Sequence, residues 1–108
     1  MDSRKIVIVY VTCPSFEAAQ KIAELAVRES LAACANVITG VHSVYKWKGS
    51  IEKSSETILI LKTLEQCTDK LTAMIQENHP YEVPAILVFD ATSANELWTK
   101  WARSEVLS

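Results

Sequence analysis

Two side chains that could bind a metal ion lie beside prolines in the sequence. His79 precedes Pro80, and Cys13 precedes Pro14 at the expected start of a helix. An imidazole and a thiolate suit copper and other borderline metals, and Glu56 could add a carboxylate. The helix N-terminus would favour the thiolate form of Cys13. The candidate ligands for copper or another divalent cation are therefore His79, Cys13 and Glu56.

Each candidate ligand also has an ordinary structural interpretation. His79 could cap the last carbonyl groups of the helix that ends before it. Cys13 could be a loop thiol, and Glu56 could form a salt bridge at the margin of a sheet. The three residues are far apart in the sequence and form no local metal-binding motif. The spacing alone leaves both interpretations open.

A second group of residues could line a pocket for a small molecule. Glu56 and Lys62 lie an even number of positions apart in one expected strand, so their side chains share a face of the sheet. Lys62 could hold an anionic ligand in a cleft between subunits, with aromatic side chains around it. The predicted pocket residues are Tyr45, Trp47, Lys62, Tyr81 and Glu82.

The sequence contains no pattern typical of an enzyme. Its two glycines, Gly40 and Gly49, belong to no phosphate-binding loop, and neither histidine accompanies a nucleophile elbow. A net charge of -2 provides no basic field for nucleic acid or an anionic membrane. We therefore expect a protein that is not an enzyme and binds neither of these partners.

The three cysteines and the first residues indicate the compartment. The cysteines form no CxxC pair, so the sequence predicts no disulfide framework, and a reducing cytosol fits best. The apolar run before Thr12 is too short for a signal-peptide core or a membrane span. These features predict a cytoplasmic protein.

Hydrophobic periodicity predicts one domain over residues 1–108. The sequence is 49% hydrophobic and 22% charged, as in ordered globular proteins. Strands are expected over 6–11, 36–47, 51–63 and 85–89, and helices over 16–31, from a capping box at 63–66 to 78, and from a capping box at 93–96 onward. The order predicts an α+β fold, a ferredoxin-like βαββαβ sandwich with an extended β-hairpin and a C-terminal helix.

The strands of this predicted sheet are apolar on both faces, although two helices can cover only one. Leaving seven such side chains in water would forgo roughly 10 to 20 kcal/mol, comparable with the stability of a whole domain. We expect subunits to associate through this face; the alternative is that the C-terminal helix folds across it. One registration of the strands exposes Val7, Val9, Val11, Leu59, Leu61, Leu87 and Phe89.

Several blocks of the sequence together resemble the CutA family of divalent-cation tolerance proteins. The resemblance implies a homotrimer of ferredoxin-like subunits whose long hairpin reaches toward a neighbour. It also implies a role in the response to metal ions, with copper or another divalent metal bound. The alternative is a PII-like small-molecule sensor or an interaction scaffold with clefts between subunits. The blocks are residues 31–36, 43–51, Glu56 with Lys62 and Thr63, and 79–84.

Overall fold

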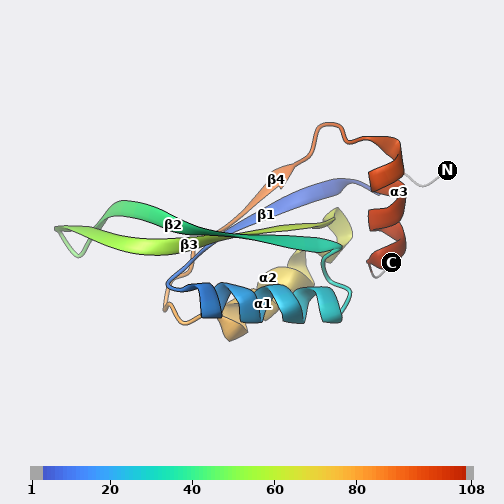
Figure 1. The fold of residues 1–108 in the computed structure, drawn as a ribbon. Coiled ribbons are helices and arrows are strands. Elements are labelled where there is room, and N and C mark those ends of the chain that lie inside the picture. Colours follow the sequence, from blue (N-terminus) through green and yellow to red (C-terminus); the bar gives the residue numbers. More distant parts are fainter. Residues whose placement is uncertain (1–3, 107–108) are drawn as a thin grey trace.

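The computed structural model describes residues 4–106, which form one antiparallel sheet and three α-helices (Figure 1). The order of elements is the predicted one, so the α+β prediction is confirmed. The elements are β1 Ile6–Cys13, α1 Phe16–Arg28, β2 Cys34–Trp47, β3 Ser50–Leu64, a 3-10 turn Glu65–Cys67, α2 Thr68–Asn78, β4 Ile86–Asp90 and α3 Glu96–Glu105.

The sheet has the strand order β2-β3-β1-β4, and all neighbouring strands are antiparallel. Strands β2 and β3 are the longest and extend beyond the rest of the sheet as an arm (Figure 1). Lys48 and Gly49 have positive φ angles of 49° and 84°, as the tight turn at the tip requires. The extended hairpin predicted from the sequence is therefore present.

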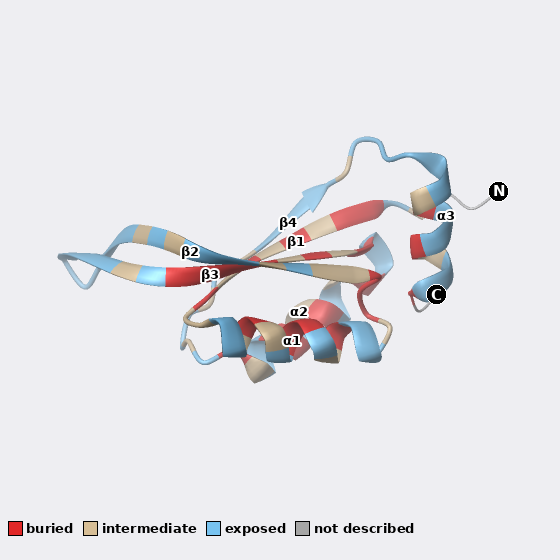
Figure 2. Cartoon of the chain, in the orientation of Figure 1, coloured by how far each residue is buried: buried red, intermediate tan, exposed pale blue. Residues whose placement is uncertain are grey.

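The hydrophobic core lies between one face of the sheet and the helices α1 and α2 (Figure 2). Ser15 caps the start of the helix α1, because its hydroxyl oxygen accepts a hydrogen bond from the backbone N–H of Ala18 at 3.1 Å. Alternate strand residues face this core and are fully buried; they include Val9, Val11, Leu59 and Leu61.

The pairing register corrects the predicted composition of the uncovered face. Val9 pairs with Leu61 and Val11 with Leu59, and these side chains pack against α1 and α2 rather than remaining exposed. The sequence alone does not show which face the helices cover, because the strands are apolar on both faces and a one-residue change of register exchanges the faces. We call the face away from α1 and α2 the open face; its apolar residues are Ile8, Tyr10, Ile38, Ile58, Ile60, Leu87 and Phe89.

The helix α3 covers only one end of the sheet, so the predicted alternative in which it lies across the open face is wrong (Figure 1). Ala102 and Val106 pack there against Ile6 and Leu64. Arg103 fixes the helix further, because its guanidinium donates hydrogen bonds to the backbone oxygen of Arg4 at 2.6 and 3.0 Å.

Both predicted capping boxes are wrong. The strand β3 continues to Leu64, and the hydroxyl of Thr63 donates a hydrogen bond to the backbone oxygen of Leu31 instead of capping α2. The helix α3 begins after Asn95 with no side-chain cap, so Ser93 takes no part. Among residues 4–106, no helix combines the length and apolar character needed to cross a membrane.

Candidate functional site

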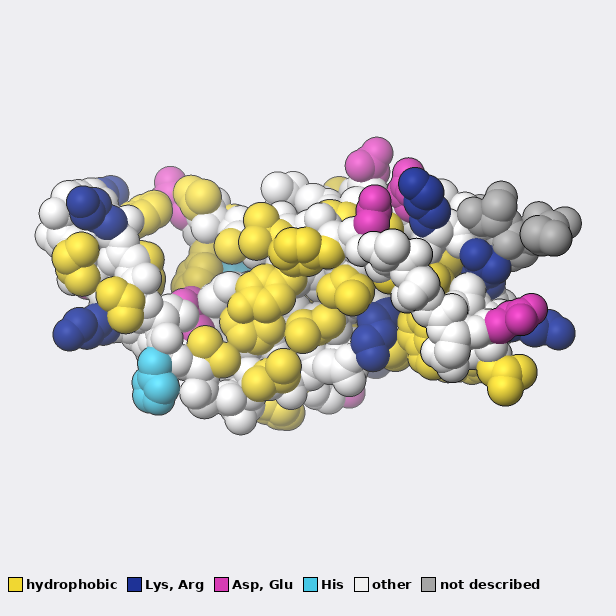
Figure 3. All heavy atoms as spheres, turned by 90° about the horizontal axis from the view of Figure 1, so that it is seen from above, with side chains coloured by type: hydrophobic (Ala, Val, Ile, Leu, Met, Phe, Trp, Pro, Cys, Tyr) yellow, Lys and Arg dark blue, Asp and Glu magenta, His cyan; other side chains and the backbone are white. Residues whose placement is uncertain are grey.

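The centre of the open face is a hydrophobic surface. Ile38, Leu87 and Phe89 are 47%, 51% and 52% exposed, although they lie in strands. Figure 3 looks down on this side of the sheet and shows hydrophobic side chains gathered in the middle, with charged side chains toward the two ends. An apolar group of this kind is typical of a surface that binds another protein chain.

A β-bulge places the hairpin residues around a cleft. Thr39 and Gly40 of β2 lie opposite the single residue Thr57 of β3, and Gly40 has a φ of 78°. The extra residue reverses which face the following side chains take, so Tyr45 lies on the face of Glu56 instead of the opposite one. A glycine inside a strand pattern is the signal that could have predicted this reversal.

The cleft lies between the hairpin and the loop from α2 to β4, and has a volume of about 420 Å³. A hollow is visible in Figure 3 between the arm and the body of the molecule. Four of the five predicted pocket residues line the cleft; the sequence analysis missed Thr12, Ser43, Val44, Val83 and Ala85. The lining residues are Thr12, Ser43, Val44, Tyr45, Trp47, Glu56, Tyr81, Glu82, Val83 and Ala85.

Lys62 is the predicted pocket residue that lies elsewhere. It shares a face of β3 with Glu56, as expected, but Ile58 and Ile60 separate them. Six residues of extended strand span roughly 20 Å. The Lys62 ammonium lies 5.8 Å from the centre of the Trp98 ring, at the end of the sheet covered by α3. Lys62 therefore cannot hold an anion in the cleft of its own subunit.

Hydrogen bonds fix the loop beside the cleft to the sheet. The Tyr81 hydroxyl donates a hydrogen bond to Oε2 of Glu56, which is only 7% exposed. The backbone N–H of Tyr81 donates to Nδ1 of His79 at 3.0 Å, so His79 carries its proton on Nε2 and donates to the backbone oxygen of Thr12 at 2.8 Å. Burial, followed by the bond to Glu56, raises the pKa of Tyr81 above its usual range.

This arrangement corrects the predicted structural role of His79. Its ring caps no carbonyl group of α2, because one nitrogen bonds to β1 and the other to the loop. His79 is buried, and its ring centre lies 5.0 Å from that of Tyr81. The residue therefore joins β1 to the loop that carries Tyr81.

Cys13 differs from the prediction in its location and its protonation state. It is the last residue of β1 rather than part of a loop, and it is fully buried. Burial, with a smaller effect from the negative charge of Glu56, raises the pKa of Cys13 to about 11. The thiol is consequently neutral near pH 7, and the expected helix-stabilised thiolate is wrong.

The three predicted metal ligands lie at the same end of the sheet but do not form a ready metal site. Glu56 acts electrostatically on Cys13, and both act on Tyr81, whose ring lies beside that of His79 at a tilt of 46°. Both nitrogens of His79 are already hydrogen bonded, and the Cys13 thiol is protonated. Within residues 4–106, no group of three or more His, Cys, Asp or Glu side chains is arranged to hold a metal ion.

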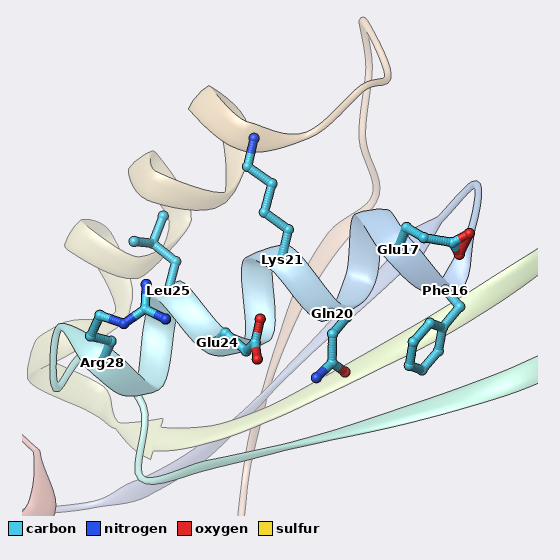
Figure 4. Close-up of a pocket in the computed structure, with 7 residues that line it drawn as sticks. All are labelled: Phe16, Glu17, Gln20, Lys21, Glu24, Leu25 and Arg28. Carbon is cyan, nitrogen blue, oxygen red and sulfur yellow. The ribbon is translucent and has the colours of Figure 1, made fainter.

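A second hollow, of about 390 Å³, lies along the helix α1 and offers no converging chemistry. All seven of its lining residues come from this one helix. Figure 4 shows that Lys21 and Gln20 point to opposite sides of the helix. Binding sites bring polar groups together around a ligand, and this surface does not. The cleft beside Tyr81 is therefore the candidate site.

Comparison with known proteins identifies relatives over nearly the whole chain. The family described as CutA1 divalent ion tolerance protein matches residues 7–105. The divalent-cation tolerance protein CutA of Pyrococcus horikoshii is 41% identical over 100 residues, which cover 93% of this chain and 97% of that protein. The chloroplastic protein CutA of Arabidopsis thaliana is 38% identical over 98 residues, or 91% of this chain and 54% of that protein.

The structural comparison agrees with the sequence comparison. The crystal structure of CutA1 from Oryza sativa matches with a TM-score of 0.93 and 35% identity, over 96% of this chain and 95% of that one. The chain spans about half the length of several of the curated plant and animal relatives that it matches. The similarity therefore covers the sheet, the helices and the cleft together.

Proposed function

Because the chain belongs to the CutA1 divalent ion tolerance family, we propose that it serves in divalent-cation tolerance as a homotrimer that associates through its open face. The observation that carries this proposal is the exposure of Ile38, Leu87 and Phe89, which lie on the open face in the edge strands β2 and β4. Fully burying a large apolar side chain stabilises by roughly 1.5 to 3 kcal/mol. Covering this face with other subunits would therefore contribute several kcal/mol per subunit.

The number of subunits, three, comes from the family resemblance, whereas association itself is supported by the open face. The helix α3 does not compete for this surface, because it packs at the end of the sheet. The hairpin extends well past the sheet, and the chain is 51 Å long but only 25 and 22 Å across. An arm of this length could reach a neighbouring subunit, as the resemblance implies.

Sedimentation equilibrium tests the homotrimer. A chain of 12.0 kDa should sediment at about three times this mass at micromolar concentration. Replacing Phe89 with glutamate should yield the monomer, because the charge would be buried between subunits. The matched control is Leu97→Glu, at a residue of α3 that is 84% exposed. A wild-type mass near 12.0 kDa would end the proposal.

A second proposed role is that of a small-molecule sensor or scaffold that uses the cleft. Three aromatic rings and the buried carboxylate of Glu56 gather around this cleft. Thermal shift assays with small charged molecules test this role, because a ligand at 100 times its Kd adds about 2.7 kcal/mol of stability. We also propose that the chain is not an enzyme, since residues 4–106 show no arrangement that argues for catalysis.

Copper binding at Cys13, Glu56 and His79 remains a candidate because all three lie beside Tyr81. Binding there would have a cost, since His79 would lose a hydrogen bond and Cys13 would lose its proton. A thiol of pKa about 11 requires about 5 kcal/mol for deprotonation at pH 7. The residues of one subunit therefore fit the metal poorly as they stand.

A copper titration decides whether these side chains matter. If copper binds at this end of the sheet, His79→Ala should weaken it at least about tenfold, while the exposed His42→Ala variant should not. Equal affinities of wild type and His79→Ala would exclude the predicted ligand set. The cytoplasm remains the compartment we propose, because the sequence has an odd number of cysteines and no CxxC pair.

A further inference from the structure

We infer that the cleft between the hairpin and the loop before β4 binds an organic ammonium cation. The inference rests on the small-molecule role proposed above, and it adds the charge and the chemical class of the ligand. Three properties of the cleft support it: the sign of its charge, its aromatic side chains and its size.

The charge of the cleft favours a cation. Among the described residues that line it, Glu56 and Glu82 are acidic and none is lysine, arginine or histidine. Glu56 is 7% exposed, and its carboxylate faces a partly dry environment in which the attraction of an opposite charge is stronger than in water. An anionic ligand would meet these carboxylates without a basic partner among the lining residues, because Lys62 lies beside Trp98.

The aromatic side chains favour an organic cation over a bare metal ion. Tyr45, Trp47 and Tyr81 all line the cleft, and the faces of such rings attract ammonium groups. Tyr45 and Trp47 are 43% and 45% exposed in the single subunit, so neither ring is enclosed by its own chain. An ammonium group of the chain itself already uses the Trp47 ring, since Nζ of Lys48 lies 5.9 Å from its centre.

The size and the remaining polar groups fit a small molecule. The volume of about 420 Å³ is within the range of ligand pockets. Thr12 and Ser43 line the same space, and their hydroxyls could donate a hydrogen bond to a polar tail of the ligand or accept one from it. A short alkylammonium with a hydroxyl group matches these features.

Choline and its uncharged analogue 3,3-dimethylbutan-1-ol test the inference, because they have nearly the same shape and differ in charge. Isothermal titration of the full chain should show choline binding, with the neutral analogue at least about tenfold weaker. Trp47→Ala should weaken choline binding roughly 3- to 30-fold. Trp101→Ala, at an equally exposed tryptophan of α3, should leave it unchanged.

The charge requires its own variant pair. Glu82→Gln should weaken choline binding several-fold, whereas Glu77→Gln, at an exposed glutamate of α2, should not. Neither side chain is buried, so both variants should fold. Equal binding of choline and the neutral analogue would overturn the ammonium assignment.

Citrate separates failure of this inference from failure of the small-molecule role. Citrate binding that Trp47→Ala abolishes, together with no binding of choline, would keep the cleft as a site and reject the cation. Binding of neither compound would reject both the cation and the role proposed for the cleft.

Discussion

Replacing Tyr81 with phenylalanine removes one hydroxyl and tests how the cleft is held together. In the wild type this hydroxyl donates a hydrogen bond to Oε2 of Glu56. The ring itself should stay in place, because it packs beside His79 and its backbone N–H remains bonded to Nδ1 of that residue. The substitution therefore isolates the bond between the loop and β3.

The expected loss of stability follows from the burial of Glu56. Its side chain is 7% exposed, so water cannot fully replace the missing donor. A hydrogen bond to a charged group contributes roughly 1.5 to 3 kcal/mol, and we expect Tyr81→Phe to lower the free energy of unfolding by about this amount. With a denaturant slope of about 2 kcal/mol per molar urea, the midpoint should fall by roughly 1 M.

Urea unfolding followed by tryptophan fluorescence measures this change, at one protein concentration for all variants because association shifts the apparent stability. Tyr45→Phe is the matched control, since Tyr45 lines the same cleft and its hydroxyl has no hydrogen bond among the described residues. In a Glu56→Gln background the loss should shrink to about half, because a neutral acceptor forms a weaker bond. If Tyr81→Phe and Tyr45→Phe lose equal stability, the bond to Glu56 does not hold the loop.

Three further substitutions test other features of the fold. The pKa of Cys13 is about 11 in the folded state, against a reference value of 9.0. The stability gained from the neutral thiol is therefore complete below about pH 9 and is lost as the pH rises toward 11. Wild type should therefore lose roughly 1 to 1.5 kcal/mol more than Cys13→Ala between pH 8 and pH 10 in urea unfolding, and parallel losses would contradict the raised pKa. Gly40→Ala should lower the stability measured by thermal unfolding by about 1 to 2 kcal/mol. The cost comes from the left-handed backbone alone, because no atom lies within 4 Å of the added methyl group. Gly40→Asn should cost less, and equal losses would argue against the left-handed conformation. Thr63→Val should lower the free energy of unfolding by about 1 to 3 kcal/mol, because it leaves the Leu31 carbonyl without its donor. The control Thr57→Val, at a buried threonine of the same strand, should cost less. Equal losses would show that the hydrogen bond to Leu31 is unimportant.

The sequence predicted the elements well because their patterns are local. The apolar run that forms β1, the helical spacing of α1 and the glycine at the hairpin tip each act within a few residues. The capping box at 63–66 failed although its spacing was right, because β3 continues through Thr63 to pair with β1. A strand that gains cross-strand partners overrides a local helix signal.

The site was harder to predict because its residues depend on register. The pocket prediction placed Lys62 with Glu56 since both share a face, but sharing a face does not make residues neighbours along a strand. Tyr45 joins the same face only through the bulge at Gly40. The position of Cys13 before a helix predicts an ionised thiol, and only its burial at the end of β1 shows that the thiol stays neutral.

The residues of β3 on the open face run from the cleft into the proposed interface. Along this strand Glu56, Ile58, Ile60 and Lys62 follow one another on a single face, so a charged residue borders the apolar centre at each end. Both charges have partners within the subunit, because Glu56 accepts a bond from Tyr81 and Lys62 lies over the Trp98 ring.

Burial of the apolar centre against another copy would therefore leave neither charge without a partner, which avoids the main cost of burying ions. An interface of this kind depends on apolar contact rather than on charge. The sedimenting mass should consequently be the same in 0.05 M and 0.5 M sodium chloride at roughly constant protein concentration, since screening weakens only the contacts between exposed charges. Dissociation at high salt would instead place ion pairs between the subunits, and association through the apolar centre of the open face would then be the wrong explanation.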